Sequence, residues 1–420
     1  MFSVLTQKLS DLKLKFLLLL GSGYMASFLC IQGIQSLMPF IQSEFGISRT
    51  QAGLYSTSLF ITATIIAVFS GGIVDRIGSR KGLIIGVSSL GVIMLLHGFA
   101  PFYSLILVLA LLAGLGFSII TPAVNKALMY EVAPSRRAVS MGIMHSGSGV
   151  GGFAGATLLP ILAGFFGWRP AIILAGGMSI ITGLIVSRRY NVNGSTAAPE
   201  DNAGENTRSG FWTQFKNILK NEQLMLACSL GLVFGLAVGA IPAHYTLYLT
   251  LDLQYSEAMA GFALGLAQLG GIFGRILWGW VSDVPLKGDR KNAFMLIMVA
   301  IVSLKLINAF GGDMLSSHPL FMLAVSLLLG VSALGWSGLF FTVVSERATA
   351  EQTGLASGVS LVFLRLGVVI GPILFGYLGD VFEHYHRSWL LLAGLVFASG
   401  LIYYLLQSRK DSEMEEIDGG

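Results

Sequence analysis

The chain carries few charges for its length. Asp, Glu, Lys and Arg together make up 11% of its 420 residues, whereas a soluble domain carries about 25%. Hydrophobic residues make up 54% of the chain and gather in runs of about 20, the length that an α-helix needs to cross a bilayer. This composition excludes a soluble globular protein and predicts an all-α membrane protein.

Cysteines and catalytic motifs are also scarce. The 2 cysteines, Cys30 and Cys228, lie in apolar runs, which argues against a disulfide framework. The sequence has no HExxH, no GxSxG and no pair of Asp residues in the middle of an apolar run. We therefore expect neither an enzyme nor a bound metal or cofactor. The basic lead Met1–Lys15 is not followed by a small-residue cleavage site, so we expect no cleaved signal.

Twelve apolar runs are long enough to span a membrane. The polar linker 188–222 divides them into two pseudo-symmetric six-helix bundles at 1–187 and 223–407, and we expect the polar end 408–420 to be a disordered cytoplasmic tail. The Gly-rich stretch 146–152 lies inside a span and indicates close helix packing. The predicted spans are 16–40, 51–74, 82–100, 102–130, 138–163, 168–187, 223–250, 257–281, 292–311, 318–345, 353–379 and 387–407.

Lys and Arg are distributed unevenly between the two sides of these spans. Most of them fall on the side of both termini, and only Arg49, Arg169 and Arg387 fall on the other side. Because basic loops remain in the cytoplasm, we expect a bacterial inner-membrane protein with both termini cytoplasmic. Because the basic residues are sorted by membrane side, the net charge of +4 does not indicate nucleic-acid binding. The expected partners are the lipid bilayer and a small anionic substrate, with the protein acting as a monomer.

Two arginines lie inside apolar spans, and no carboxylate lies mid-span to face them. Arg365 is near the middle of span 353–379, and Arg275 lies in span 257–281, eight residues before Asp283. A cation at the bilayer centre costs roughly 2.5–3.5 kcal/mol. Either each guanidinium is held by a neighbouring helix or by Asp283, or its counter-ion is a ligand. We favour a ligand, because the planar fork of arginine binds a carboxylate bidentately.

Other polar side chains in the spans could bind that ligand or join helices together. Lys126 could face the mouth of a cavity or reach the membrane interface, and Lys305 is expected to extend to the outer interface. His145 and His244 could carry a coupling proton or serve as packing residues, whereas anion exchange needs no proton site. The candidates for hydrogen bonds to the substrate are Gln32, Gln35, Asn125, Tyr245 and Tyr248.

The loop between the second and third spans has the pattern Gly-x-x-x-Asp-Arg-x-Gly-x-Arg-Lys. The pattern resembles the signature loop of the major facilitator superfamily, and a weaker copy surrounds Asp283, about half a chain later. The resemblance implies the major facilitator fold. It also implies a gate latch, in which Asp75 and its basic neighbours join the two bundles on the cytoplasmic side. The residues of the motif are Gly71, Asp75, Arg76, Gly78, Arg80 and Lys81.

A finer resemblance concerns the eighth span. Arg275-x-x-x-Gly279-x-x-x-Asp283 is similar to the eighth-span Arg of monocarboxylate transporters and of the oxalate–formate antiporter, where it pairs with the substrate carboxylate. The basic residue at Arg365 is similar to a Lys of that antiporter. The stretches 121–143 and 334–346 look like bacterial anion:cation symporters and cyanate-type transporters.

These resemblances imply a secondary active transporter that works by alternating access. The predicted substrate is a mono- or short dicarboxylate such as lactate, pyruvate or oxalate, moved by proton symport or by anion exchange. Alternative substrates are an inorganic anion of the nitrate or cyanate kind, or a sugar acid. Drug efflux is disfavoured, because two arginines without a mid-span acid would repel a cationic drug.

Overall fold

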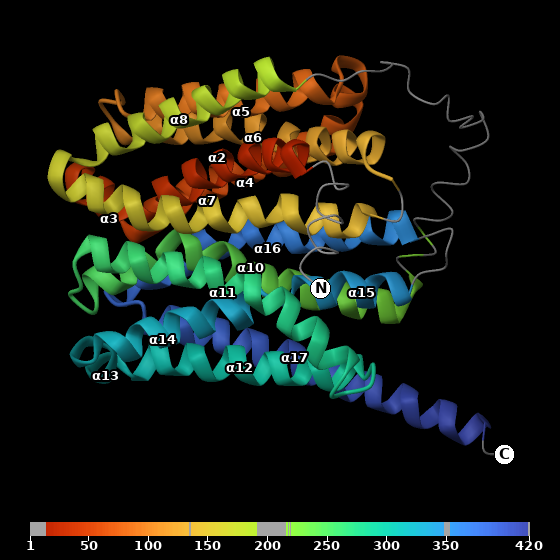
Figure 1. Ribbon diagram of the computed structural model, residues 1–420. Coiled ribbons are helices and arrows are strands. Elements are labelled where there is room, and N and C mark those ends of the chain that lie inside the picture. The colour runs from red at the N-terminus through yellow and green to blue at the C-terminus, as the bar shows by residue number, and fades with distance from the viewer. Residues whose placement is uncertain are drawn as a thin grey trace, which may run out of the picture. The chain divides into compact units, whose positions relative to one another are not determined.

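Helices make up all of the regular structure in the part of the chain that is described, and no strand occurs there. The computed structural model describes residues 14–133, 136–190, 216, 218, 220–347 and 353–418. The helices, labelled in Figure 1, are α2 (Leu14–Ser36), α3 (Met38–Phe45), α4 (Arg49–Ile77), α5 (Ser79–His97), α6 (Tyr103–Glu131), α7 (Arg137–Phe166), α8 (Trp168–Arg189), α10 (Glu222–Leu251), α11 (Glu257–Asp283), α12 (Arg290–Phe310), α13 (Gly312–Ser317), α14 (Pro319–Leu329), the π-helix η2 (Gly330–Leu334), α15 (Ser337–Glu346), α16 (Thr353–Val381) and α17 (His386–Asp418).

The described residues contain 12 helical segments long and apolar enough to cross a membrane. They confirm the predicted all-α membrane fold with twelve spans. The tenth span, Pro319–Glu346, is built from α14, η2 and α15. The first predicted span, 16–40, is divided at Leu37, and Pro39 lies in the first turn of α3. Proline lacks an N–H and is best accommodated in the first turn of a helix, which favours a new helix start here.

The chain divides into two compact units. Most of the predicted linker 188–222, including residues 191–215, lies outside the described residues. The predicted bundle boundaries therefore stay a prediction. Unit 1 comprises Met1–Glu200, Tyr245–Thr250 and Tyr255–Gly265, and unit 2 comprises Asp201–His244, Leu251–Gln254 and Leu266–Gly420.

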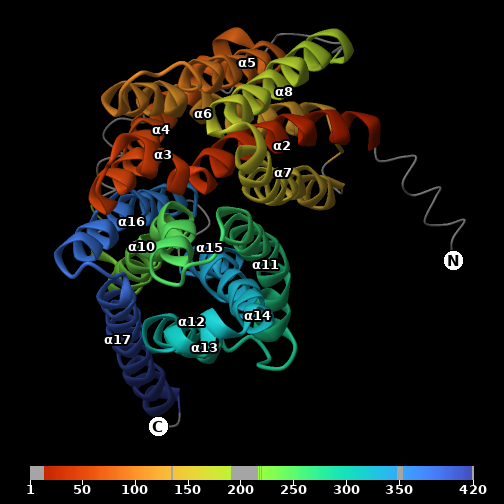
Figure 2. The same ribbon diagram turned by 90° about the vertical axis from the view of Figure 1, so that its left-hand side faces the viewer.

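In unit 1, α2 lies along α7, and α5 lies along α8 (Figures 1 and 2). The first contact depends on glycines of the stretch 146–152. A Cβ atom at Gly147 would lie 2.4 Å from the carbonyl oxygen of Gly21, and one at Gly151 would lie 2.1 Å from that of Met25. Any side chain there would force the two backbones apart, which confirms the predicted close packing.

In unit 2, α12 packs beside α17, and this contact corrects the prediction for Lys305. The Lys305 side chain is fully buried, and its Nζ lies 5.3 Å from the centre of the Trp389 ring on α17. It does not extend to the outer interface as expected. The expectation was wrong because it considered only the depth of the residue in the span, whereas the face of α12 that carries Lys305 is covered by α17.

The last helix, α17, continues to Asp418. The disorder expected over 408–420 stays a prediction. Arg409, Lys410 and the following Glu and Met residues are good helix formers, and no Gly or Pro occurs before Gly419. The helix of the last span can therefore continue past the end of its apolar run.

A polar cluster fastens one end of unit 1. Glu44, on α3, accepts hydrogen bonds of 2.5 Å from Trp168 Nε1 and from Arg169 Nη2 at the start of α8. Arg169 Nη1 also donates to the carbonyl oxygens of Gly98 and Ala100, between α5 and α6. The cluster thus joins three connections of the bundle through one carboxylate and one guanidinium, and charge-assisted bonds of this kind are stronger than neutral ones.

The Glu44 cluster predicts an acid-dependent loss of stability. Burial alone would raise the pKa of Glu44, but hydrogen bonds from Arg169 and Trp168 and the charge of Arg169 outweigh burial and lower the pKa. A carboxyl whose pKa is lowered by folding contributes stability above its unfolded pKa, about 4.3, and this contribution disappears as the pH falls through the folded pKa. Glu44→Gln should therefore melt at a lower temperature than the wild type at pH 7.

The difference between Glu44→Gln and the wild type should shrink when both are melted in detergent at pH 4 and below. A difference in melting temperature that stays constant from pH 7 to pH 3 would mean that the Glu44 charge does not stabilise the fold.

Candidate functional site

Arg365 lies near the middle of α16, and its side chain is half-buried. Its guanidinium has no hydrogen-bond or ion-pair partner among the described residues. The backbone on both sides of Arg365 is closely packed. A Cβ atom at Gly367 would lie 2.1 Å from the Leu232 carbonyl oxygen on α10, and one at Gly235 would lie 2.3 Å from that of Leu364. The helix that carries Arg365 is therefore in direct backbone contact with α10 on either side of the residue.

Arg275 lies in the second half of α11, and its side chain is exposed. Like Arg365, it has no hydrogen-bond or ion-pair partner in the described part of the chain. Asp283, the alternative partner in the sequence, is instead paired with Arg290. Unit 2 therefore holds two span arginines whose charge is not compensated by any described carboxylate, as the sequence predicted.

The π-helix η2 packs against α11 directly beside Arg275. A Cβ atom at Gly274 would lie 2.1 Å from the Val331 carbonyl oxygen, and one at Gly330 would lie 1.9 Å from that of Ala267. Trp278 Nε1 donates to the same Val331 oxygen at 2.9 Å. π-Helical turns are rare and are frequently found at functional sites. No sequence pattern predicted η2, because its residues lie within one continuous apolar run.

Unit 1 carries amide oxygens that lack donors. The Oε1 atoms of Gln32 and Gln35 and the Oδ1 atom of Asn125 are buried and have no hydrogen-bond partner among the described residues. Gln35 is partly engaged, because its Nε2 donates to Ser56 Oγ at 3.1 Å. A buried acceptor without a donor is costly, so these three oxygens are places where a ligand hydroxyl would be favourable.

The two predicted tyrosines lie in the part of α10 that belongs to unit 1. Tyr245 and Tyr248 are almost fully buried, and their rings are stacked with centroids 6.2 Å apart. Of the two histidines, His145 on α7 is half-buried and meets the Tyr24 ring edge-on at 4.9 Å. These contacts fit packing as well as ligand binding, so the roles of Tyr245, Tyr248 and His145 stay predictions.

His244 is fully buried in unit 2, and both ring nitrogens have partners. Nε2 lies 2.8 Å from the Pro372 carbonyl oxygen on α16, and Nδ1 lies 3.1 Å from the Tyr385 hydroxyl. The rings of Phe375 and Tyr385 surround it at 5.5 Å. This environment favours the packing role that we considered for His244 over that of a proton carrier.

The motif between α4 and α5 is held within unit 1. Asp75 forms an ion pair of 2.6 Å with Lys126 on α6, and Arg80 donates to the Ser187 carbonyl oxygen. Gly78, with φ of 85°, joins α4 to α5 in a conformation that side chains disfavour. Lys126 is therefore engaged by Asp75 and is a weaker candidate for the substrate. The latch between bundles through Asp75 stays a prediction, as do the roles of Gly71, Arg76 and Lys81.

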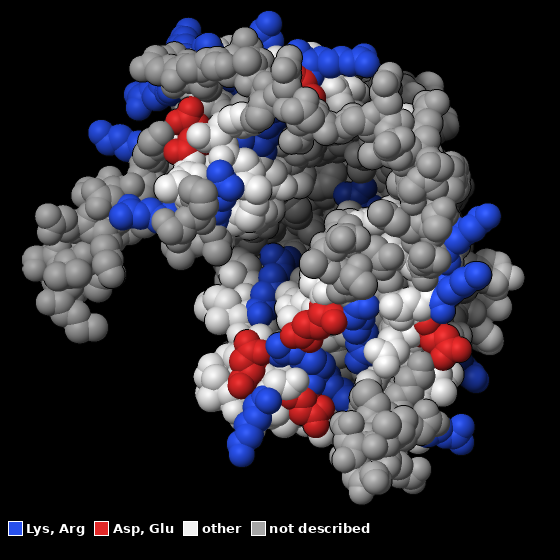
Figure 3. Space-filling view, turned by 90° about the vertical axis from the view of Figure 1, so that its right-hand side faces the viewer, with Lys and Arg blue, Asp and Glu red and all other residues white. Residues whose placement is uncertain are grey.

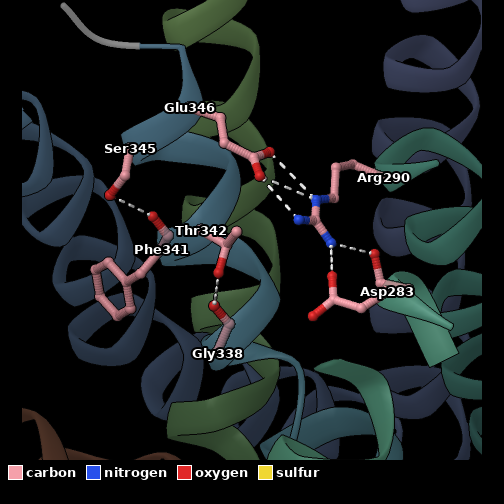
Figure 4. A network of polar contacts seen from close by, with 8 residues as sticks. Asp283, Arg290, Gly338, Phe341, Thr342, Ser345 and Glu346 are labelled. Atoms are coloured by element: carbon pink, nitrogen blue, oxygen red, sulfur yellow. Dashed lines mark hydrogen bonds and ion pairs between the residues drawn. The ribbon is translucent and has the colours of Figure 1, made fainter. Parts of the chain in front are cut away.

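The corresponding region of unit 2 is a charged cluster that joins three helices (Figure 4). Arg290, the first residue of α12, donates to Asp283 and Ser282 of α11 and to Glu346 of α15, the last at 2.8 Å. The α15 face beside Glu346 lines a shallow groove with Gly338, Phe341, Thr342 and Ser345. Sequence reasoning identified Asp283 but missed Glu346, which lies 56 positions from Arg290 and has no local spacing signal.

Basic side chains are the more frequent charged groups on the face where α15 ends and α16 begins, as the described residues in Figure 3 show. This is the side that the distribution of Lys and Arg predicted to be cytoplasmic.

A family model and several known proteins match most of the chain. The family model for the Major Facilitator Superfamily matches residues 20–367 and 246–418. The hexuronate transporter of Bacillus subtilis (strain 168) is 23% identical over 407 residues, which cover 92% of this chain and 93% of that protein. The D-galactonate transporter of Escherichia coli O6:H1 is 24% identical over 386 residues, which cover 87% of this chain and 89% of that protein.

A solved structure shares the fold. It is the crystal structure of a bacterial homologue of the human lysosomal transporter Spinster, in an inward-facing and unoccupied conformation. It matches with a TM-score of 0.74 and 16% sequence identity over 93% of this chain and 95% of that chain.

Proposed function

The chain belongs to the major facilitator superfamily, and from that premise we propose that it is a secondary transporter of a small organic anion in the bacterial cytoplasmic membrane. Members of the family are transporters and not enzymes, and the chain is an integral, multi-pass membrane protein. The observation that carries the proposal is the pair of span arginines, Arg275 and Arg365, without a carboxylate partner among the described residues. An anionic substrate would supply the charge that the protein lacks.

Within the organic anions, we favour a sugar acid. The relatives are named as transporters of hexuronate and of D-galactonate, both of which are polyhydroxylated carboxylates. The buried amide oxygens of Gln32, Gln35 and Asn125 lack donors, and sugar hydroxyls are donors that lactate, pyruvate and oxalate offer sparingly or not at all. A sugar acid carries the negative charge that Arg275 and Arg365 lack, and its hydroxyls are donors of the kind that buried amide oxygens need.

The other substrates fit less well. A short monocarboxylate or dicarboxylate carries a charge for Arg275 and Arg365 but offers few or no hydroxyl donors. Nitrate or cyanate would offer no hydroxyl at all. The coupling mechanism is either proton symport or anion exchange. Because both nitrogens of His244 are already hydrogen-bonded, His145 is the better of the two candidates for a coupling proton.

Counterflow in proteoliposomes tests the proposal. Vesicles that contain purified protein and unlabelled glucuronate should accumulate labelled glucuronate. Vesicles with glucuronate but without protein should not. Galactonate and galacturonate in the outer solution should compete, whereas glucose, which has the hydroxyls without the charge, should not. Accumulation that lactate or nitrate suppresses more strongly than galacturonate would move the substrate to one of the alternative classes. Suppression by glucose would contradict the role of the arginines.

A further inference from the structure

Hydrogen bonds through Asp252, Tyr385 and His244 link the turn after α10 to Pro372 in the second half of α16. At the inner end of this chain of bonds, His244 of α10 meets the Pro372 carbonyl oxygen at 2.8 Å. A carbonyl can only accept, so Nε2 must carry the proton, and Nδ1 of the neutral ring accepts from the Tyr385 hydroxyl at 3.1 Å. The ring is fully buried, and hydrogen bonds made away from water are electrostatically stronger than those at the surface.

The outer end of the chain fixes Tyr385. Asp252, in the turn after α10, accepts a hydrogen bond of 2.7 Å from the Tyr385 backbone N–H. The Asp252 side chain is only 9% exposed, and His384 Nδ1 lies 3.8 Å from its other oxygen. The Tyr385 ring is stacked on Phe375 of α16 with centroids 5.4 Å apart. Contacts other than the one with His244 therefore fix both the backbone and the ring of Tyr385.

The inner end of the chain acts on the helix that carries Arg365. Pro372 lies seven residues, or about two helical turns, after Arg365 and offers no N–H to the α16 ladder. Between the two residues, α16 is in backbone contact with α10. A Cβ atom at Gly239 would lie 2.3 Å from the Val368 carbonyl oxygen, and one at Gly371 would lie 2.2 Å from that of Leu236. Such a glycine contact sets how closely the helices approach but has no donors to fix their rotation or sliding.

We propose that Asp252, Tyr385 and His244 are positioning residues that lock α16 against α10 and thereby hold Arg365 in its substrate-binding orientation. The His244 bond to Pro372 supplies the directional contact that the glycine surfaces lack. The importance of this lock for transport rests on the proposed function of Arg365, whereas the lock itself is a property of unit 2 alone.

Four variants separate this role from general stability. Tyr385→Phe removes only the hydroxyl that donates to His244. His244→Leu removes both bonds, and His244→Gln can place a side-chain N–H near the former Nε2. The matched control is Ser388→Ala, because the buried Ser388 hydroxyl also joins α17 to α16, donating to the Phe375 carbonyl oxygen at 2.7 Å. A purely structural role predicts the same behaviour for Tyr385→Phe and Ser388→Ala.

The test combines hydrogen exchange of α16 with glucuronate binding, both measured on purified full-length protein in detergent. Exchange of peptides covering 361–376 should accelerate in Tyr385→Phe and more in His244→Leu, with partial recovery in His244→Gln. In Ser388→Ala it should stay near the wild-type rate. Glucuronate should bind about fivefold to tenfold more weakly to Tyr385→Phe, which is the effect of losing one buried hydrogen bond. Its affinity for Ser388→Ala should fall clearly less than for Tyr385→Phe, because the Ser388 bond to Phe375 does not involve His244 or Pro372.

Hydrogen exchange tests the lock, and glucuronate binding by the wild type tests the proposed substrate, so the two proposals can fail independently. Unchanged exchange in both Tyr385→Phe and His244→Leu would overturn the lock, whatever the binding data. Equal losses of affinity in Tyr385→Phe and Ser388→Ala would also overturn it. Accelerated exchange in a protein whose wild-type form does not bind glucuronate would uphold the lock and count against the proposed substrate.

Discussion

Arg365→Gln is expected to lose glucuronate binding almost completely while the protein still inserts and folds. Gln keeps a hydrogen-bonding end but is shorter and has no charge, so the substrate carboxylate would lose its counter-ion. Removal of one partner of a buried charge pair costs about 2–5 kcal/mol. At 1.4 kcal/mol for each tenfold change, the dissociation constant should rise roughly 30-fold to several thousand-fold. Arg365→Lys should retain part of the affinity, because it keeps the charge but loses the bidentate fork.

The measurement is titration calorimetry with glucuronate, together with thermal melting of each variant. The matched control is Arg387→Gln, the same substitution on α17 at an arginine that lies 5.3 Å from the Phe382 ring. Arg387→Gln should bind glucuronate like the wild type. Wild-type affinity in Arg365→Gln would show that the guanidinium is structural.

Gly330→Ala is expected to cause the largest loss of stability among single methyl additions in unit 2. The new Cβ would lie 1.9 Å from the carbonyl oxygen of Ala267 and 2.6 Å from its carbonyl carbon. Both atoms belong to the backbone of α11, so no side chain can move aside to relieve the clash. Over-packing of this kind typically costs about 1–3 kcal/mol, and more where the neighbour is rigid. Separation of η2 from α11 should also displace Arg275 and weaken substrate binding.

The matched control is Gly279→Ala on α11, where an added Cβ meets no atom within 4 Å. Ala is favoured over Gly in a helix by up to about 1 kcal/mol, so Gly279→Ala should melt at or above the wild-type temperature. The midpoint of thermal unfolding in detergent compares the three proteins. Similar midpoints for Gly330→Ala and the wild type would mean that η2 can move away from α11 without cost.

The spans could be predicted from sequence because each depends on a local property. A run of about 20 apolar residues has few alternatives to a membrane helix, and the twelve predicted runs correspond to the twelve spans found among the described residues. The loop with Asp75 and Gly78 was recognisable for a similar reason, since its spacing lies within a few residues. The close packing at 146–152 followed from the small side chains themselves.

The contacts of single polar residues could not be predicted in this way. Lys305 was expected at the membrane interface, but the ring of Trp389, 84 positions later in the chain (389 − 305), covers it. His244 was a candidate proton carrier in the sequence, but its contacts with Pro372 and Tyr385 favour a packing role. Tertiary packing decides which face of a helix is covered, and no spacing along one helix encodes that. The unpaired state of Arg275 and Arg365 was foreseeable because it depended on the absence of mid-span acids.

The most direct test of an arginine-bound organic anion compares one sugar acid with its own amide. Glucuronamide has the hydroxyls and nearly the shape of glucuronate but no negative charge, so it would leave Arg275 and Arg365 uncompensated. Competition with labelled glucuronate for binding to the purified protein should give an inhibition constant for glucuronamide at least about tenfold higher than that for unlabelled glucuronate. Equal inhibition by the acid and the amide would mean that the arginines do not bind the substrate charge.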